Sequence, residues 1–298
     1  MLRDDHVILA SGYDDASGEG GVFRLAGGHF EQLDAMPSTG LAVAEGRLAR
    51  LLRSPGAGDA ELLVYGPGGR ERRYRIPHVG DPHDVAWDGN CFVVVSTFTN
   101  EIHWVARSGE TVRVERMASE PDAWHVNSVV SAGGRLFFSV FGRYSRYREW
   151  KGEHCIGAGS IVDLATGRDA VSGLSAPHHP RPLDGEWLVC NSFLRELVAV
   201  DRKGEIARRL PLGGWTRGLA VTDGAILVGE SAQRERDPPG ATAAVTIVDR
   251  TSWEVRERVP LPCREAYDVV VAPSALAEGV RAAASGARAR PRGRDRAR

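Results

Sequence analysis

A block of two apolar stretches joined by a tight turn recurs along this chain, and this repeat constrains the fold more than any other sequence feature. The turn is of the Asp-Gly or Gly-Gly kind, as at Asp88-Gly89 and Gly133-Gly134, where a hairpin needs residues that tolerate positive φ. Four copies align without a gap, and a weaker first copy and a final half copy extend the series. The six copies begin at Thr39, His83, Val126, His179, Arg217 and Tyr267.

The copies follow one another at intervals of about 40 to 50 residues, which is the length of a four-stranded propeller blade. After each hairpin comes a third apolar stretch, such as ELVAVD (196–201), and then a more polar one, such as EIARRLPL (205–212). A polar fourth strand suits the solvent-exposed rim of a blade. The sequence therefore predicts an all-β fold, a six-bladed β-propeller.

The two ends of the chain complement each other. The half copy at Tyr267 supplies only an innermost strand, whereas residues 6–13, 21–28 and 29–34 read as a second, a third and an outer strand. Pairing them closes the last blade and removes two unpaired sheet edges. We therefore predict one propeller domain over residues 1–273. Residues 274–298 are low in large apolar side chains and rich in arginine, so they are predicted to be a disordered tail.

Composition and motifs narrow the partners and the cellular location. The formal net charge of -1 at pH 7 argues against binding to nucleic acid or to a membrane surface, and no Gly-rich phosphate loop indicates a nucleotide cofactor. No apolar run has the length of a membrane span or of a signal-peptide core, so we predict a cytoplasmic protein of open oligomeric state. The cysteines form no C-x-x-C pair and are predicted to be buried free thiols: Cys91, Cys155, Cys190 and Cys263.

Histidines gather at one end of the predicted inner strands. In an antiparallel blade, the start of the innermost strand and the end of the second strand lie on the same face of the disc, near the axis. His83, His125, His178 and His179, four of the nine histidines, occupy such positions in three consecutive blades. Two interpretations stand. These imidazoles bind a metal or catalyse a reaction, or they cap strands and satisfy loop backbone groups.

The functional interpretation predicts a divalent metal, Zn, Fe, Mn or Ca, which would polarise a carbonyl or activate water. Its predicted ligands are His83, His125, His178, His179 and Asp268. In the same interpretation His83, His125 and His179 are ligands or acid and base groups. Glu230 is then a carboxylate partner, and Arg217 is the clamp for an anionic substrate group.

Two blades carry insertions on the histidine face, at residues 143–155 and 231–242. The first contains Tyr144, Tyr147 and Trp150 together with several arginines, a composition that suits covering a polar or anionic ligand. The alternative is that the insertion is a surface loop without a role in binding. The predicted substrate-binding set is completed by side chains near the strand ends, namely Asn127, Asn191 and Tyr267.

The segments PHHPR (177–181) and TRGLA (216–220), with HDVAWDG from residue 83 and WHVNSVV from residue 124, resemble a bacterial family of uncharacterised proteins. The resemblance covers most of residues 7–273 and implies a propeller without an established activity. More distantly, the chain is similar to gluconolactonase-like and NHL-type six-bladed propellers. Lactonases of that class hold a divalent metal on the axis with Glu, Asn and Asp, parts that Glu230, Asn127 and Asp268 would take here.

The additional histidines depart from the lactonase pattern and favour propeller lyases or epimerases, in which histidine binds metal or transfers protons. We therefore expect a metal-assisted enzyme of lyase, epimerase or hydrolase type. Its substrate would be a polar or anionic small molecule, carbohydrate-like or a natural-product intermediate, bound in the axial funnel. The alternative is a non-catalytic propeller that binds a protein or glycan partner on the same face.

Overall fold

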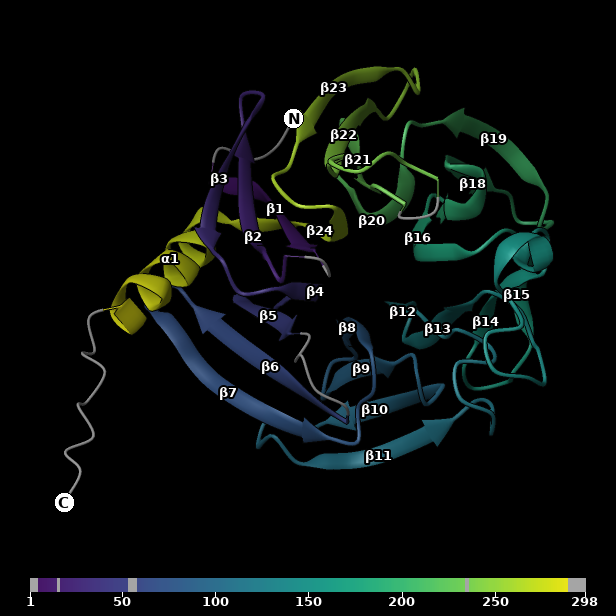
Figure 1. Ribbon diagram of the computed structural model, residues 1–298, viewed down its shortest axis with the longest axis horizontal. Coiled ribbons are helices and arrows are strands. Elements are labelled where there is room, and N and C mark those ends of the chain that lie inside the picture. The colour runs from purple at the N-terminus through teal and green to yellow at the C-terminus, as the bar shows by residue number, and fades with distance from the viewer. Residues whose placement is uncertain (1–4, 15–16, 53–57, 234–235, 289–298) are drawn as a thin grey trace.

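The computed structural model of the protein describes residues 5–14, 17–52, 58–233 and 236–288. Its strands form six four-stranded antiparallel sheets around a central axis, with the first strand of each repeat innermost (Figure 1). Each sheet is one blade, and we number the blades from the first one built of consecutive strands. The predicted six-bladed β-propeller is confirmed.

Blades 1 to 5 each consist of four strands that follow one another in the chain. They are β4 (Ser38–Ala44), β5 (Arg47–Leu52), β6 (Asp59–Gly66) and β7 (Gly69–Pro77) in blade 1; β8 (Pro82–Trp87), β9 (Phe92–Ser96), β10 (Glu101–Val105) and β11 (Thr111–Arg116) in blade 2; β12 (Ser128–Ala132), β13 (Arg135–Val140), β14 (Gly159–Asp163) and β15 (Asp169–Leu174) in blade 3; β16 (Pro177–Leu183), β17 (Glu186–Asn191), β18 (Glu196–Val200) and β19 (Ile206–Pro211) in blade 4; and β20 (Trp215–Val221), β21 (Ala225–Ser231), β22 (Ala244–Asp249) and β23 (Val255–Pro260) in blade 5. Two short 3-10 helices, Gly152–Cys155 and Ser192–Leu194, lie in connections between the second and third strands of blades 3 and 4.

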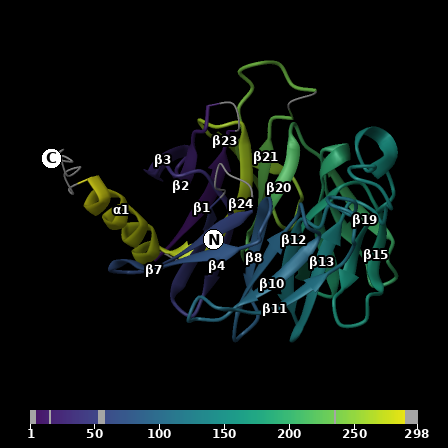
Figure 2. The ribbon, with the colours of Figure 1, turned by 60° about the horizontal axis from the view of Figure 1, so that its bottom comes forward.

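Blade 6 joins the two ends of the chain. Its strand order is β24 (Glu265–Pro273), β1 (His6–Tyr13), β2 (Gly20–Ala26) and β3 (His29–Asp34). The pairing of β1 with β24 runs antiparallel from His6 opposite Pro273 to Tyr13 opposite Glu265. The predicted closure is confirmed, and it leaves the ring of blades without an open seam (Figure 2).

The polar residue that ends the second strand of most repeats holds adjacent blades together. The Thr97 hydroxyl donates to the carbonyl of Val126 at 2.7 Å, and the Ser231 hydroxyl donates to that of Ala266 at 3.1 Å. The Ser192 hydroxyl bonds the Thr216 carbonyl in the same way at 2.5 Å. The bonds of Ser192 and Ser231 reach the inner strand of the next blade, and that of Thr97 reaches Val126, just before such a strand. Apolar side chains fill the space between blades, and all four cysteines are buried and free, as predicted.

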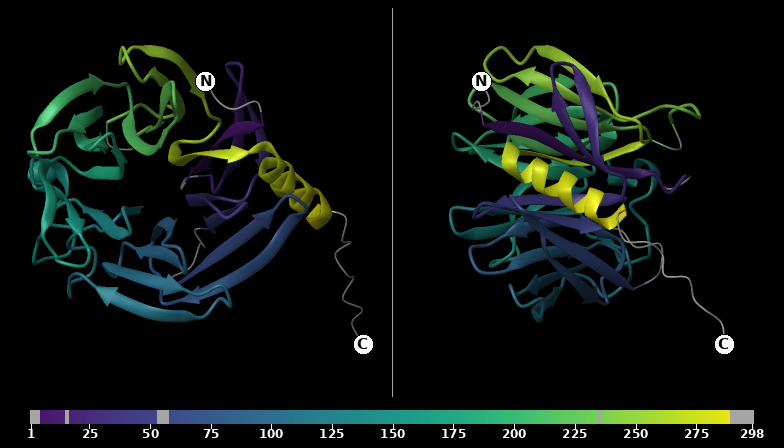
Figure 3. Two further views of the ribbon diagram at one scale, coloured as in Figure 1. Left: turned by 180° about the vertical axis from the view of Figure 1, so that it is seen from behind. Right: turned by 90° about the vertical axis from the view of Figure 1, so that its left-hand side faces the viewer.

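The prediction of a disordered tail is wrong for residues 274–288, which form the helix α1 (Ser274–Arg288) across the outside of blades 6 and 1 (Figure 3). Leu276, Ala277 and Val280 are buried there against an apolar cluster that includes Leu63 and Tyr65. Alanine-rich sequence favours a helix, and its small side chains suffice to cover the seam. Residues 289–298 lie outside the described residues. Within the described ranges, no helix is long and apolar enough to cross a membrane.

Candidate functional site in the axial funnel

A pocket of about 300 Å³ opens on the axis at the face where the inner strands begin. Both long insertions reach it, as the sequence predicted. Among the described residues, its wall consists of Asp81, His83, His125, Phe141, Arg148, Trp150, Lys151, Gly152, Cys155, Phe193, Trp215, Arg217, Ser231, Ala232, Gln233, Arg236, Glu265 and Tyr267. Five of the predicted site residues are in this wall, namely His83, His125, Trp150, Arg217 and Tyr267.

His125 is held by a buried carboxylate. Its Nδ1 lies 2.7 Å from Oδ1 of Asp122, whose other oxygen accepts a hydrogen bond from Nε of Arg148 at 2.5 Å. Burial alone would raise the pKa of Asp122, but the hydrogen bond from His125 and the contacts with Arg148 outweigh it and lower that pKa. Asp122 is therefore ionised, and its carboxylate accepts a hydrogen bond from Nδ1–H of His125. The Nε2 atom of His125 is left as the ring nitrogen for a ligand.

Aromatic packing and backbone conformation fix the orientation of His125. The ring contacts Phe141, with centroids 4.1 Å apart, and Trp150, with centroids 4.3 Å apart, and these two rings also contact each other. His125 and Asp122 both have left-handed backbone conformations, with φ of 50° and 46°. Such conformations cost energy outside glycine and cluster at functional sites. The surrounding structure thus holds this histidine and its carboxylate in a defined geometry.

His83 and Arg217 stand across the pocket from one another around Tyr267. The His83 ring lies 5.3 Å from the His125 ring and 5.6 Å from the Tyr267 ring, measured between centroids. The Arg217 guanidinium lies 4.6 Å from the Tyr267 centroid and donates to Oε2 of Glu265 at 2.8 Å. An arginine held in this way offers its remaining donors to an anionic group.

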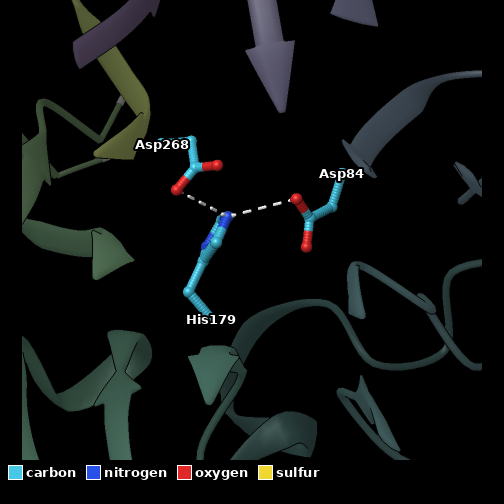
Figure 4. Close-up of side chains that lie close together, drawn as sticks. All are labelled: Asp84, His179 and Asp268. Atoms are coloured by element: carbon cyan, nitrogen blue, oxygen red, sulfur yellow. Dashed lines mark ion pairs between the residues drawn. The ribbon is translucent and has the colours of Figure 1, made fainter. Parts of the chain in front are cut away.

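Below the pocket, three alternate blades place ionisable side chains together on the axis (Figure 4). Nε2 of His179 in blade 4 lies 3.8 Å from Oδ1 of Asp84 in blade 2 and 3.5 Å from Oδ1 of Asp268 in blade 6. All three side chains are almost completely buried. We call Asp84, His179 and Asp268 the axial group. Burial raises the pKa of both carboxyl groups, and burial lowers that of the imidazole.

Each member of the axial group accepts a hydrogen bond from the inner strand of the following blade. Oδ2 of Asp84 accepts the N–H of Val129 at 2.9 Å, and Oδ2 of Asp268 accepts that of Leu41 at 2.9 Å. Nδ1 of His179 accepts the N–H of Gly218 at 3.1 Å. Three of the six blade junctions are therefore bonded through this group, a structural function that the sequence did not reveal.

The axial group has the chemical composition of a metal site, but its hydrogen bonds do not suit one. Because Nδ1 of His179 accepts a hydrogen bond from the N–H of Gly218, it has no proton of its own, and the proton of the neutral ring is on Nε2, the atom that faces the carboxylates. A metal ligand would need a lone pair at that position. The inner oxygens of both carboxylates also accept backbone N–H groups, those of Val85 and Val269 at 2.8 Å. Of the predicted metal ligands, only His179 and Asp268 belong to this group.

Several predicted site residues serve the blades instead of the pocket. Oε2 of Glu230 accepts the N–H of Gly214 at 2.6 Å, and its other oxygen accepts the Thr246 hydroxyl inside blade 5. Asn191 accepts the N–H of Ser175 at 2.6 Å and donates to Glu196 at 2.7 Å. The side-chain polar atoms of Glu230 and Asn191 are therefore bonded within the propeller, and neither residue is in the pocket wall.

Other predicted residues support the pocket wall from behind. The side chain of Asn127 donates to the carbonyl of His125 at 3.2 Å, and the buried His178 packs on Phe141 and Trp215. Tyr144 donates to the carbonyl of His154, whereas Tyr147 is half exposed and contacts Phe98. None of these four predicted residues is in the wall.

The structure also adds residues that sequence reasoning missed. Asp122 is the most important, and its place three residues before His125 was a usable signal, because such a spacing lets a carboxylate reach a ring nitrogen. Arg148 stood in the predicted insertion without a role. Trp215, Phe193 and Phe141 carried no signal of their own, since aromatic residues are usually part of the core.

A second hollow of about 180 Å³ lies between blades 1 and 2 and has no connection to the predicted site. Its charged side chains pair with each other, Arg47 with Glu71 at 2.7 Å and Arg107 with Glu45. None of the predicted site residues lines it. Of these two hollows, only the funnel pocket is lined by predicted site residues.

Comparison with known proteins identifies the fold and a family. A profile for a family described as "Domain of unknown function (DUF4915)" matches residues 73–276. No curated protein matches the sequence. A protein of unknown function from Bacteroides caccae has a similar structure, with a TM-score of 0.62, 13% identity, and coverage of 90% of this chain and 99% of its own.

Two solved structures of named propellers are also similar. A luciferin-regenerating enzyme shares 12% identity over 76% of this chain and 77% of its own, with a TM-score of 0.55. A calcium-binding protein, regucalcin, from Agrobacterium tumefaciens shares 15% identity over 76% of this chain and 75% of its own, with a TM-score of 0.51. At these identities the likeness concerns the propeller fold alone, in agreement with the predicted resemblance to gluconolactonase-like proteins.

Proposed function

The chain belongs to the family described as "Domain of unknown function (DUF4915)", and we propose that it is an enzyme that binds an anionic small molecule in the axial pocket and transfers a proton on it. The observation that carries this proposal is the hydrogen bond between His125 and Asp122 in the wall of a cationic pocket. Propellers of similar fold include a protein named as an enzyme, which is compatible with catalysis here.

The charges of the wall favour an anion. Four cationic side chains, Arg148, Lys151, Arg217 and Arg236, face two carboxylates, Asp81 and Glu265, among the described residues of the wall. No carboxylate of the described part of the chain lies within ion-pairing distance of Lys151 or Arg236. An acidic group on the substrate would be attracted to these cations, and the enclosed position strengthens the attraction.

His125 is the group that we assign to proton transfer. Asp122 fixes its tautomer and stabilises the charged ring that forms when Nε2 takes up a proton. His83, with its ring 5.3 Å away, stands where it can serve as the second acid or base. Withdrawal and return of a proton at carbon is the step shared by lyases and epimerases, and activation of water by the same nitrogen would serve a hydrolase.

Metal assistance, which the sequence predicted, enters no step of this proposal. The residues that would hold the metal are those of the axial group, and the hydrogen bond from Gly218 gives His179 the wrong tautomer for a ligand. Recognition by Arg217 and proton transfer by His125 need no metal.

A deuterium-exchange screen tests the proposal. The purified protein is incubated with a panel of organic acids in D₂O, and NMR records exchange at carbon or conversion to product. We expect at least one acid to react, and His125→Gln and Asp122→Asn to lower the rate about 100-fold or more, as loss of a general acid or base does. His29→Gln, on the exposed strand β3, is the matched control and should react normally.

Two results would overturn the proposal that the protein is an enzyme. One is a reaction that persists at the normal rate in both variants. The other is an acid that binds in the pocket but neither exchanges nor reacts, which would favour the alternative of a non-catalytic binding propeller.

A further inference from the structure

We infer that the ligand of this pocket is an aromatic carboxylic acid with a single ring, an inference that rests on the proposed function and specifies its substrate class. Three features of the pocket support it, namely a continuous aromatic wall, a rim with four cationic side chains, and a volume that suits one ring with a short acidic arm.

The aromatic wall is continuous from one insertion to the other side of the pocket. Trp150 packs on Phe141 with ring centroids 5.1 Å apart, Phe141 faces Trp215 at 6.4 Å, and Trp215 meets Phe193 at 6.2 Å. Phe141, Phe193 and Trp215 are almost completely buried, so their positions are fixed by packing. Such a series of rings gives the pocket an aromatic surface, on which an aromatic ligand can pack edge to face or offset-stacked.

The cationic rim supplies the acid-binding group next to this wall. The Arg236 guanidinium lies 4.1 Å from the centroid of Phe193 and donates to the Phe193 carbonyl at 3.3 Å. Because Arg236 both contacts Phe193 and lines the pocket, a carboxylate attached to a ring bound at this wall would be near its guanidinium. Lys151, in the other insertion, also lines the pocket.

Neutral hydrogen-bonding side chains are scarce in the wall, which argues against a sugar acid. Besides its histidines, the described part of the wall contains Ser231, Gln233, Tyr267, Trp150 and Trp215. Two of these already donate to backbone carbonyls, Ser231 to that of Ala266 at 3.1 Å and Trp150 to that of Asp122 at 2.8 Å. A sugar acid carries a hydroxyl on nearly every carbon, more than these few groups can pair.

The volume sets the size of the ligand. A closed cavity of about 150 Å³ takes a benzene molecule. The pocket of about 300 Å³ therefore has room for one ring and a short carboxylate arm, but not for a fused ring system with long substituents.

Calorimetric titration of the full chain tests this inference without requiring turnover. The probes are phenylacetate, its neutral counterpart phenylacetamide, gluconate and inorganic phosphate. We expect phenylacetate to bind at least about tenfold more tightly than each of the other three, because only it matches both the wall and the rim.

Two variants separate the wall from the rim. Arg236→Gln should weaken the binding of phenylacetate about tenfold and leave that of phenylacetamide unchanged. Phe193→Leu should weaken the binding of both. Arg73→Gln, on the outer strand β7, is the charge-matched control and should bind like the wild type. Equal or tighter binding of gluconate or phosphate, or no binding of phenylacetate, overturns the inference.

The outcome is distinguishable from that of the exchange screen. If the protein catalyses His125-dependent exchange on a sugar acid, the proposed function is supported and the aromatic-acid substrate class is rejected. If the protein binds phenylacetate with the expected variant pattern but exchanges no acid, the aromatic-acid site is supported and the proposed enzymatic function is rejected.

Discussion

The backbone N–H of Gly218 donates to Nδ1 of His179 across the junction between blades 5 and 4, at 3.1 Å. This bond places the proton of the neutral imidazole on Nε2, between the carboxylates of Asp84 and Asp268. An N–H thus stands at the centre of the axis, where a metal ligand would need a lone pair.

We therefore expect the fold to be independent of divalent metal. Dialysis against EDTA should leave the melting temperature unchanged, and elemental analysis of the purified protein should find well below one equivalent of transition metal or calcium. About one equivalent, lost on dialysis together with a fall in melting temperature, would show that the axial group binds metal in spite of this hydrogen bond.

Replacing His179 should destabilise the propeller. His179→Leu removes the acceptor of the Gly218 N–H and the only ring N–H beside two buried carboxyl groups, so we expect a loss of about 2 to 4 kcal/mol in the free energy of unfolding. His179→Gln retains a side-chain donor and acceptor and should lose less. Urea denaturation measures both. Equal stability of the leucine variant and the wild type would show that the axial group does not join the blades.

The Asp122 carboxylate should make stability depend on pH in a defined window. Its pKa is lowered on folding, so its ionised form stabilises the fold at every pH above the ordinary aspartate value of about 4. This contribution is lost as the pH falls from about 4 through the lower value of the folded state. The difference in unfolding free energy between the wild type and Asp122→Asn should therefore be constant near neutral pH and shrink below about pH 4.

The exposed Asp223→Asn serves as the control for this measurement and should show no such window. A difference between wild type and Asp122→Asn that stays constant down to pH 3 would mean that Asp122 is not held as a carboxylate by His125 and Arg148.

The docking of α1 should depend on a glycine. A Cβ atom on Gly279 would lie 2.1 Å from the carbonyl oxygen of Gly66, so the helix approaches blade 1 backbone to backbone. Replacing a helical glycine by alanine usually stabilises by about 1 kcal/mol through helix propensity. Here the clash should reverse the sign, and Gly279→Ala should lower the melting temperature. A higher melting temperature would show that α1 does not pack closely on blade 1.

The repeat predicted the fold because each blade is a local unit whose turns and apolar stretches are adjacent in the sequence. It predicted the location of the site for the same reason, since the start of every inner strand lies near the axis. His83, His125 and Arg217 were found in this way.

The orientation of individual side chains was not predictable from strand alternation. The register of β16 with β17 shifts between His178 and Arg181, and that of β20 with β21 shifts between Arg217 and Leu219. Such bulges break the alternation of side chains. His179 therefore points to the axis while His178 packs behind the pocket wall. The contact of Arg148 with Asp122 depends on the path of an insertion, which no periodicity describes.

Blade 6 has a consequence for the synthesis of the protein. The strand β1 leaves the ribosome well before its partner β24, which begins at Glu265. At about 5 to 20 residues per second, roughly 10 to 50 s pass between the two. During that time the apolar residues of β1 and β2 have no inner strand to pair with. The yield of folded protein in a cell should therefore depend on how well the emerging N-terminal segment is shielded, more than on the stability of the finished ring.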